Sequence, residues 1–104
     1  MSIDIANVFK DMANIAGKSL QDEGIELGDE IRSALENNKA SIAELVEART
    51  CGDINQEDFD LELAREKQVL QAELIGVEIA GKAAVQKAVD SAMHILSSAV
   101  SAAL

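Results

Sequence analysis

Apolar residues recur every three or four positions at the start of the chain, the spacing that places them on one face of an α-helix. The members of this stripe are Ile5, Val8, Phe9, Met12, Ala16 and Leu20. Ser2 or Asp4 can cap the first turn, because a short polar side chain accepts a hydrogen bond from a free amide there. The pattern therefore predicts a helix over residues 4–23.

A break or bend is expected where this first helix ends. The apolar stripe continues in phase through Leu27 and Ile31, which would allow one long helix. Gly24 followed by Ile25, however, suits a left-handed cap, and a glycine inside a helix costs about 1 kcal/mol relative to alanine. We therefore expect the helix to break or bend near residues 24–28.

The next segment predicts a short helix that ends near Thr50. The Asn-Asn-Lys run at 37–39 is a weak interruption of the helical pattern. Ser41 and Glu44 then have the spacing of a capping box, in which each side chain satisfies a free amide. The pattern leaves open whether residues 4–50 form one bent helix or two to three shorter ones.

A turn over residues 51–55 is the clearest boundary in the sequence. Gly52 suits the C-terminal cap of the preceding helix. Asn55 is a strong N-cap, because an acid follows three residues later. Ile54 and Phe59 are placed to form the hydrophobic contact that often accompanies such a cap.

From residue 56 the pattern contains no proline and no clear stop, so it predicts one long C-terminal helix over 56–104. Such a helix would be roughly 75 Å long. A compact domain of this size is only about 25–30 Å across, so the helix must bend, protrude or pair along its length. The sequence thus predicts a single all-α domain. It is either an elongated helical hairpin with an N-terminal arm over 4–50 or a small helix bundle.

The C-terminal helix has an apolar arc that covers about half its circumference, more than packing on one layer requires. One flank of the arc is small and consists of Ala84, Ala88, Ala92 and Ala99. The other is bulky and consists of Val85, Val89, Met93, Leu96 and Val100. A small flank permits close helix approach and a bulky flank a wider spacing, so this helix is expected to meet two neighbours.

These nine residues are the predicted oligomer interface. The N-terminal arm can cover one flank, and a second copy of the chain would cover the other, which favours a homo-dimer or a larger helical assembly. The alternative is that the N-terminal segments fold into two or three short helices that cover both flanks within one chain. The first interpretation implies a non-enzymatic scaffold or interaction protein that self-associates through this helix.

The charge of the chain indicates a second candidate class of function. Nineteen acids and nine bases give a net charge of −10, which repels nucleic acids and anionic membranes. The last 31 residues carry only two acids and two bases. The densest acidic run, which could dock a basic protein partner, consists of Glu57, Asp58, Asp60, Glu62 and Glu66. The alternative function is therefore an acidic antagonist or immunity-type protein.

Candidate chemistry is sparse. Cys51 is the only cysteine, so no internal disulfide can form, and the chain start lacks the order of a secretory signal. A cytoplasmic protein is therefore expected. His94 is the only histidine, and neither it nor Cys51 has the partners that a metal site or a nucleophile needs. Charges interrupt the apolar C-terminal stretch, which argues against a membrane span. We expect no enzyme activity and no cofactor.

One local resemblance adds to the interpretation. The run Gly-Asp-Ile-Asn-Gln-Glu-Asp-Phe at 52–59, followed by Leu63 and Lys67, resembles the short helix-turn-helix module SHOCT. The resemblance covers residues 45–70, and Asn55 stands where the family usually has threonine. It implies an oligomerisation or adaptor role rather than a reaction, and we carry over no functional residue from it.

Overall fold

The computed structural model describes residues 4–25, 28–77 and 82–104, and these ranges contain four α-helices and no strand. The helices are α1 (Ile5–Asp22), α2 (Gly28–Thr50), α3 (Gln56–Val77) and α4 (Lys82–Ala103). The predicted all-α class is confirmed. Of the two predicted architectures, the small helix bundle is the one that forms.

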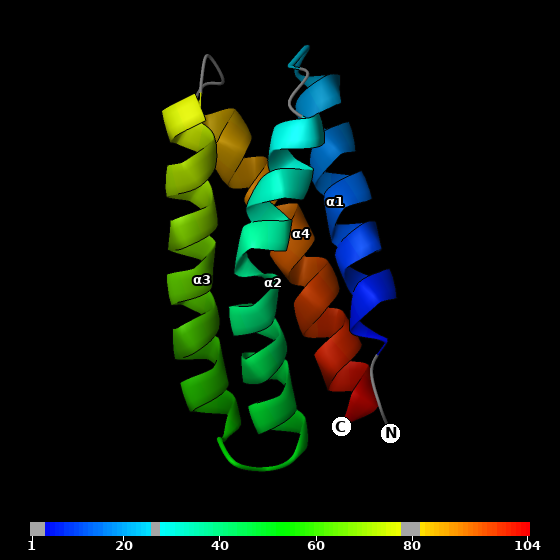
Figure 1. Ribbon diagram of the computed structural model, residues 1–104, viewed down its shortest axis with the longest axis vertical. Coiled ribbons are helices and arrows are strands. Elements are labelled where there is room, and N and C mark those ends of the chain that lie inside the picture. The colour runs from blue at the N-terminus through cyan, green and yellow to red at the C-terminus, as the bar shows by residue number, and fades with distance from the viewer. Residues whose placement is uncertain (1–3, 26–27, 78–81) are drawn as a thin grey trace.

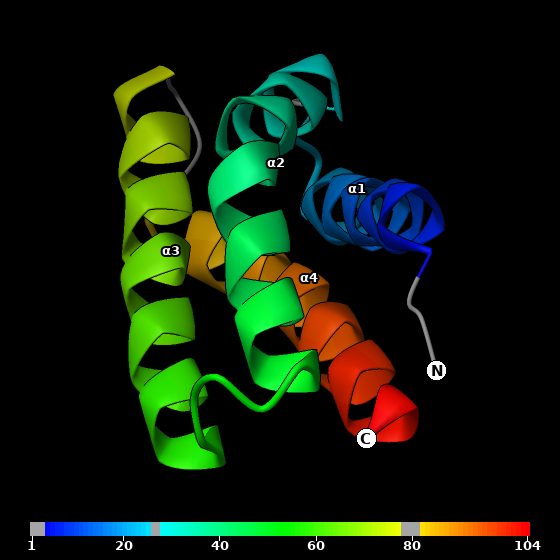
Figure 2. The same ribbon diagram turned by 60° about the horizontal axis from the view of Figure 1, so that its bottom comes forward.

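The four helices run alternately up and down (Figure 1). Helix α1 packs against α2 and α4, and α3 packs against the same two helices from the other side. The start of α1, the end of α4 and the α2–α3 turn lie at one end of the bundle, as both views show (Figure 2). The principal extents are 40 × 22 × 19 Å and the radius of gyration is 13.3 Å, close to the value of about 13 Å expected for a compact domain of about 100 residues.

One hydrophobic core runs through the bundle and receives side chains from every helix. The predicted stripe of α1 is buried at Phe9, Met12, Ala16 and Leu20. Within the described part of the chain, every fully buried side chain is apolar. The core therefore holds the helices together by hydrophobic burial. Among the described residues, the hydroxyl oxygen of the half-buried Ser19 is also shielded from water and has no hydrogen-bond partner.

The ends of α1 follow the predicted caps. The Asp4 carboxylate accepts a hydrogen bond from the Asn7 backbone amide at 3.3 Å. At the other end Gly24 has a φ of +78°, and the amide of Ile25 donates to the Leu20 carbonyl at 2.9 Å. The predicted break is therefore confirmed, because this left-handed cap ends the helix.

Helix α2 is continuous, so the predicted interruption at the Asn-Asn-Lys run and the capping box at Ser41 are wrong. The side-chain amide of Asn38 donates to the Ala34 carbonyl at 2.8 Å and to the Glu73 carboxylate of α3 at 3.0 Å. The hydroxyl of Ser41 donates to Glu66, also on α3. Both side chains bind the neighbouring helix, and Asn38 also donates to a backbone carbonyl one turn earlier in α2, which leaves the helix continuous.

The α2–α3 turn is confirmed. Gly52 has a φ of +83°, the left-handed conformation that glycine adopts at low cost. The Asn55 side chain accepts a hydrogen bond from the Asp58 amide at 2.8 Å, and α3 begins at the next residue after this cap. Ile54 packs against the core, and Phe59 is buried in it.

The single long C-terminal helix is the main correction to the prediction. Helix α3 ends at Val77 and α4 begins at Lys82; the junction at 78–81 lies outside the described residues. Helix α4 returns alongside α3, and an ion pair between Lys67 and Asp90 joins them. Folding back lets the apolar faces of both helices share the same core, whereas a straight rod would leave them exposed to water.

Candidate functional site

The predicted oligomer interface lies inside the protein's own core. Its fully buried members are Val85, Ala88, Val89, Ala92, Met93, Leu96 and Val100, and its half-buried members are Ala84 and Ala99. Helix α4 has two main neighbours, as predicted, but both belong to the same chain. They are α1 and α3, and α4 also touches α2 across the core. The flank expected to remain free for a second copy is therefore already covered.

The predicted acidic docking face consists of Glu57, Asp58, Asp60, Glu62 and Glu66. The structure places these carboxylates around α3 rather than on one face. Asp60 lines a cleft toward α4, whereas Glu66 accepts a hydrogen bond from Ser41 of α2 on the opposite flank. Glu62 is paired with Arg65 at 3.0 Å. A partner that approaches from one direction cannot meet all five together.

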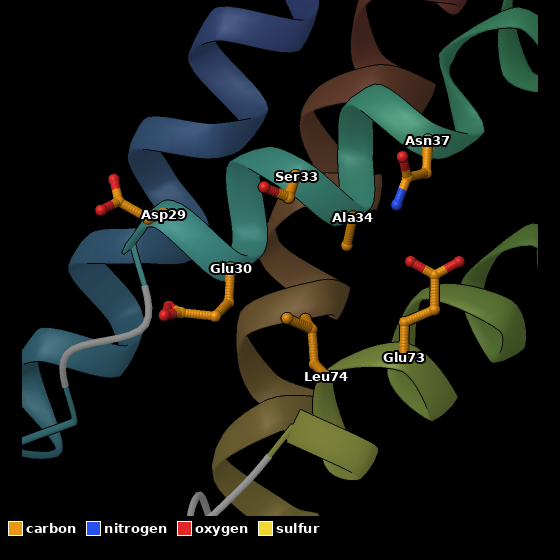
Figure 3. A pocket seen from close by; sticks show the side chains of 7 residues that line it. All are labelled: Asp29, Glu30, Ser33, Ala34, Asn37, Glu73 and Leu74. Carbon is orange, nitrogen blue, oxygen red and sulfur yellow. The ribbon is translucent and has the colours of Figure 1, made fainter.

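A different acidic group gathers in a cleft between α2 and α3, with a volume of about 250 Å³. Its lining residues are Asp29, Glu30, Ser33, Ala34 and Asn37 from α2 and Glu73 and Leu74 from α3. Figure 3 shows Asn37 and Ala34 facing Glu73 and Leu74 across the cleft. The hydrogen bond from Asn38 holds the Glu73 carboxylate in place at this edge. Carboxylates from both helices thus line this cleft together with the apolar side chains of Ala34 and Leu74.

The charge of this acidic cleft is largely uncompensated. Asp29 is 3.8 Å from Arg32, but both side chains are mostly exposed, and such a pair contributes little. Glu30 and Glu73 form no ion pair with any residue that the structure describes. A lysine or arginine side chain fits this chemistry, because its methylene stem can lie on apolar surface while its head group pairs with carboxylates.

A groove of opposite charge lies on the other flank of α2, between α2 and α1, with a volume of about 360 Å³. Its apolar lining consists of Ala6, Phe9, Ala13 and Leu35. Its charged lining consists of Lys10, Arg32, Glu36 and Lys39. Helix α2 therefore separates an acidic cleft from a basic groove. Neither was predicted, because each needs side chains from two helices.

The lone histidine lies in a third, shallow cleft between α3 and α4. Asp60, Lys67 and Asp90 surround His94 there, and the Lys67–Asp90 ion pair crosses the cleft. Among residues 4–25, 28–77 and 82–104, no three metal-ligating side chains gather. The single cysteine, Cys51, is exposed in the α2–α3 turn.

Two further findings bear on the class of protein. No helix in the described ranges combines the length and the apolar character that crossing a bilayer requires. No protein-family model matches the chain, and no curated protein or solved structure matches it either. The resemblance to the SHOCT module over residues 45–70 therefore stays a prediction.

Proposed function

We propose that this chain is a non-enzymatic helical interaction protein that binds a basic protein partner through the acidic cleft between α2 and α3. The observation that carries the proposal is that Glu30 and Glu73, beside the apolar floor of Ala34 and Leu74, form no ion pair within the part of the chain that the structure describes. A lysine or arginine that enters this cleft would gain charge-assisted hydrogen bonds. The net charge of −10 would speed its approach.

Self-association through α4, the other function expected from the sequence, is less well supported. The residues that would carry it are fully or half buried within the chain. A second copy could reach them only if α1 or α3 first moved away from α4. An exposed free thiol at Cys51 fits a reducing compartment, so the proposal places the protein in the cytoplasm.

The test is a titration with a fluorescent peptide of about fifteen residues that is rich in lysine and arginine. Replacing two of the three cleft carboxylates, in a Glu30→Gln and Glu73→Gln double variant, should weaken binding roughly tenfold, because charges that would pair with the peptide are lost. The same titration at several NaCl concentrations should show a steep loss of affinity as salt rises.

Glu47→Gln is the matched control. Glu47 is an exposed carboxylate at the other end of α2, so its loss changes the net charge but not the cleft. We expect this variant to change the dissociation constant less than about twofold. The opposite result would be that Glu47→Gln weakens binding by as much per removed charge as the cleft double variant does. Affinity would then depend on the net charge of the protein, and the cleft would not be the binding site.

A further inference from the structure

The groove between α1 and α2 is a basic site on an acidic protein. The chain has nine bases, and three of them, Lys10, Arg32 and Lys39, line this one groove. Glu36 is the single carboxylate among its lining residues. Positive charge is therefore concentrated at one place on a molecule that elsewhere carries a large excess of acids.

The cations of this groove are free to meet a ligand. Lys10 and Lys39 make no ion pair with any residue in the described part of the chain. Arg32 has one such pair, with Asp29 at 3.8 Å, and 70% of the Arg32 side chain stays exposed. An exposed pair of this length is worth little and can be exchanged for a better partner.

The floor of the groove is apolar. Phe9 and Leu35 form it with only 7% and 5% of their surfaces exposed, so they are fixed in the core. Ala6 and Ala13 flank Phe9 on α1, and their small side chains leave the space above the floor open. A bulky apolar side chain placed there would be removed from water against these residues.

The spacing of the cations points to a helical ligand. Arg32 and Lys39 are seven positions apart on α2, which corresponds to two turns and about 10.5 Å. A helix that lies along the groove would present carboxylates at the same seven-residue spacing, with an apolar residue between them facing the floor.

We propose that the α1–α2 groove docks an acidic amphipathic helix of a partner protein, with two carboxylates seven residues apart and a leucine or phenylalanine between them. At about 0.15 M salt the screening length is about 8 Å, so the nearby cations outweigh the more distant acids of the chain. This site lies on the other flank of α2 from the acidic cleft, and the exposed Asp29–Arg32 ion pair links their linings. The chain would then join a basic partner and an acidic partner.

The test uses an alanine-based helical peptide that carries this pattern and a fluorescent label, titrated by anisotropy at 0.15 M NaCl. We expect saturable binding that weakens roughly tenfold in a Lys10→Ala and Lys39→Ala double variant. Glu36→Gln should instead tighten binding about threefold, because the one repulsive charge of the groove is removed. A peptide with serine in place of its leucine should bind at least about tenfold more weakly.

The matched control is a Lys18→Ala and Lys82→Ala double variant, which removes two exposed lysines that do not line the groove. It should change the affinity less than about twofold. Equal effects of the two double variants would overturn the proposal, and so would the absence of saturable binding. A Glu30→Gln and Glu73→Gln background should leave this binding unchanged even if the acidic cleft proves inactive.

Other occupants would give different results. If octanoate bound with the same dependence on Lys10 and Lys39 while the peptide did not bind, the groove would be a small-molecule site. If the wild-type protein showed a concentration-dependent mass that the Lys10→Ala and Lys39→Ala variant lost, the groove would take a second copy of the chain. Either result would overturn the assignment to a partner helix.

Discussion

At the scale of single residues, two glycines determine where α1 and α2 end. Gly24 and Gly52 have φ values of +78° and +83°, and a Cβ added at either would meet no atom within 4 Å. At both positions a side chain is therefore disfavoured by the positive φ of the backbone and not by contact with neighbouring atoms. Both positions could be predicted from the sequence, because the signals for a cap are local.

Replacing Gly52 with alanine should lower the free energy of unfolding by about 1–2 kcal/mol, the cost of a left-handed conformation for a residue with a Cβ. Gly52→Asn should cost less, because asparagine tolerates this conformation better. Urea denaturation monitored by circular dichroism measures both. An alanine variant as stable as the wild type would mean that the turn does not impose the observed φ.

Other residues could not be interpreted from local signals. Asn38 and Ser41 have the side chains of a helix interruption and a cap, yet both lie inside α2. Their partners on α3, Glu73 and Glu66, are 35 and 25 positions further along the chain. Only the packing of α2 on α3 reveals these contacts, so a pattern confined to a few neighbouring residues predicts the wrong role.

At the scale of helices, periodicity identified the apolar faces but not how many helices would share them. The breadth of the apolar arc on α4 correctly indicated that this helix packs against more than one neighbour. The second neighbour is α3, which the pattern had merged with α4 into a single rod. Gly76 and Gly81 were the available signal for a break, since each lowers helix stability by about 1 kcal/mol relative to alanine.

The buried face and the exposed face of α4 should respond very differently to a glutamate substitution. Ala88 is fully buried, so Ala88→Glu places an unpaired charge in the core and should destabilise the fold by at least about 3 kcal/mol. Ser98 is exposed, and Ser98→Glu should stay within about 0.5 kcal/mol of the wild type. Thermal unfolding distinguishes them. Similar melting temperatures for the two variants would contradict the assignment of these faces.

At the scale of the whole molecule, the candidate sites arise from the order in which helices surround the core. The acidic cleft needs α2 beside α3, and the basic groove needs α2 beside α1. The sequence predicted an acidic run on α3 alone, because charges close in sequence are easy to recognise. It could not reveal which distant residues would share a cleft, since that depends on helix order and rotation.

The burial of the α4 interface makes a clear prediction about assembly. We expect light scattering at micromolar concentration to give a mass near that of one chain, 11.0 kDa, because both flanks of α4 are already covered. Dilution should not change this value. A stable dimer whose mass persisted on dilution would contradict this prediction, and it would mean that α1 or α3 moves away from α4 or that another surface drives self-association.

The position of the chain ends has one more consequence. The first residues of α1 and the last residues of α4 lie at the same pole as the α2–α3 turn, and each helix is adjacent to the ones before and after it around the bundle. A short peptide that joined the two ends would close the four helices into a covalent ring. The ring could then be cut at the α2–α3 turn to give a circular permutant with every helix still beside its present neighbours.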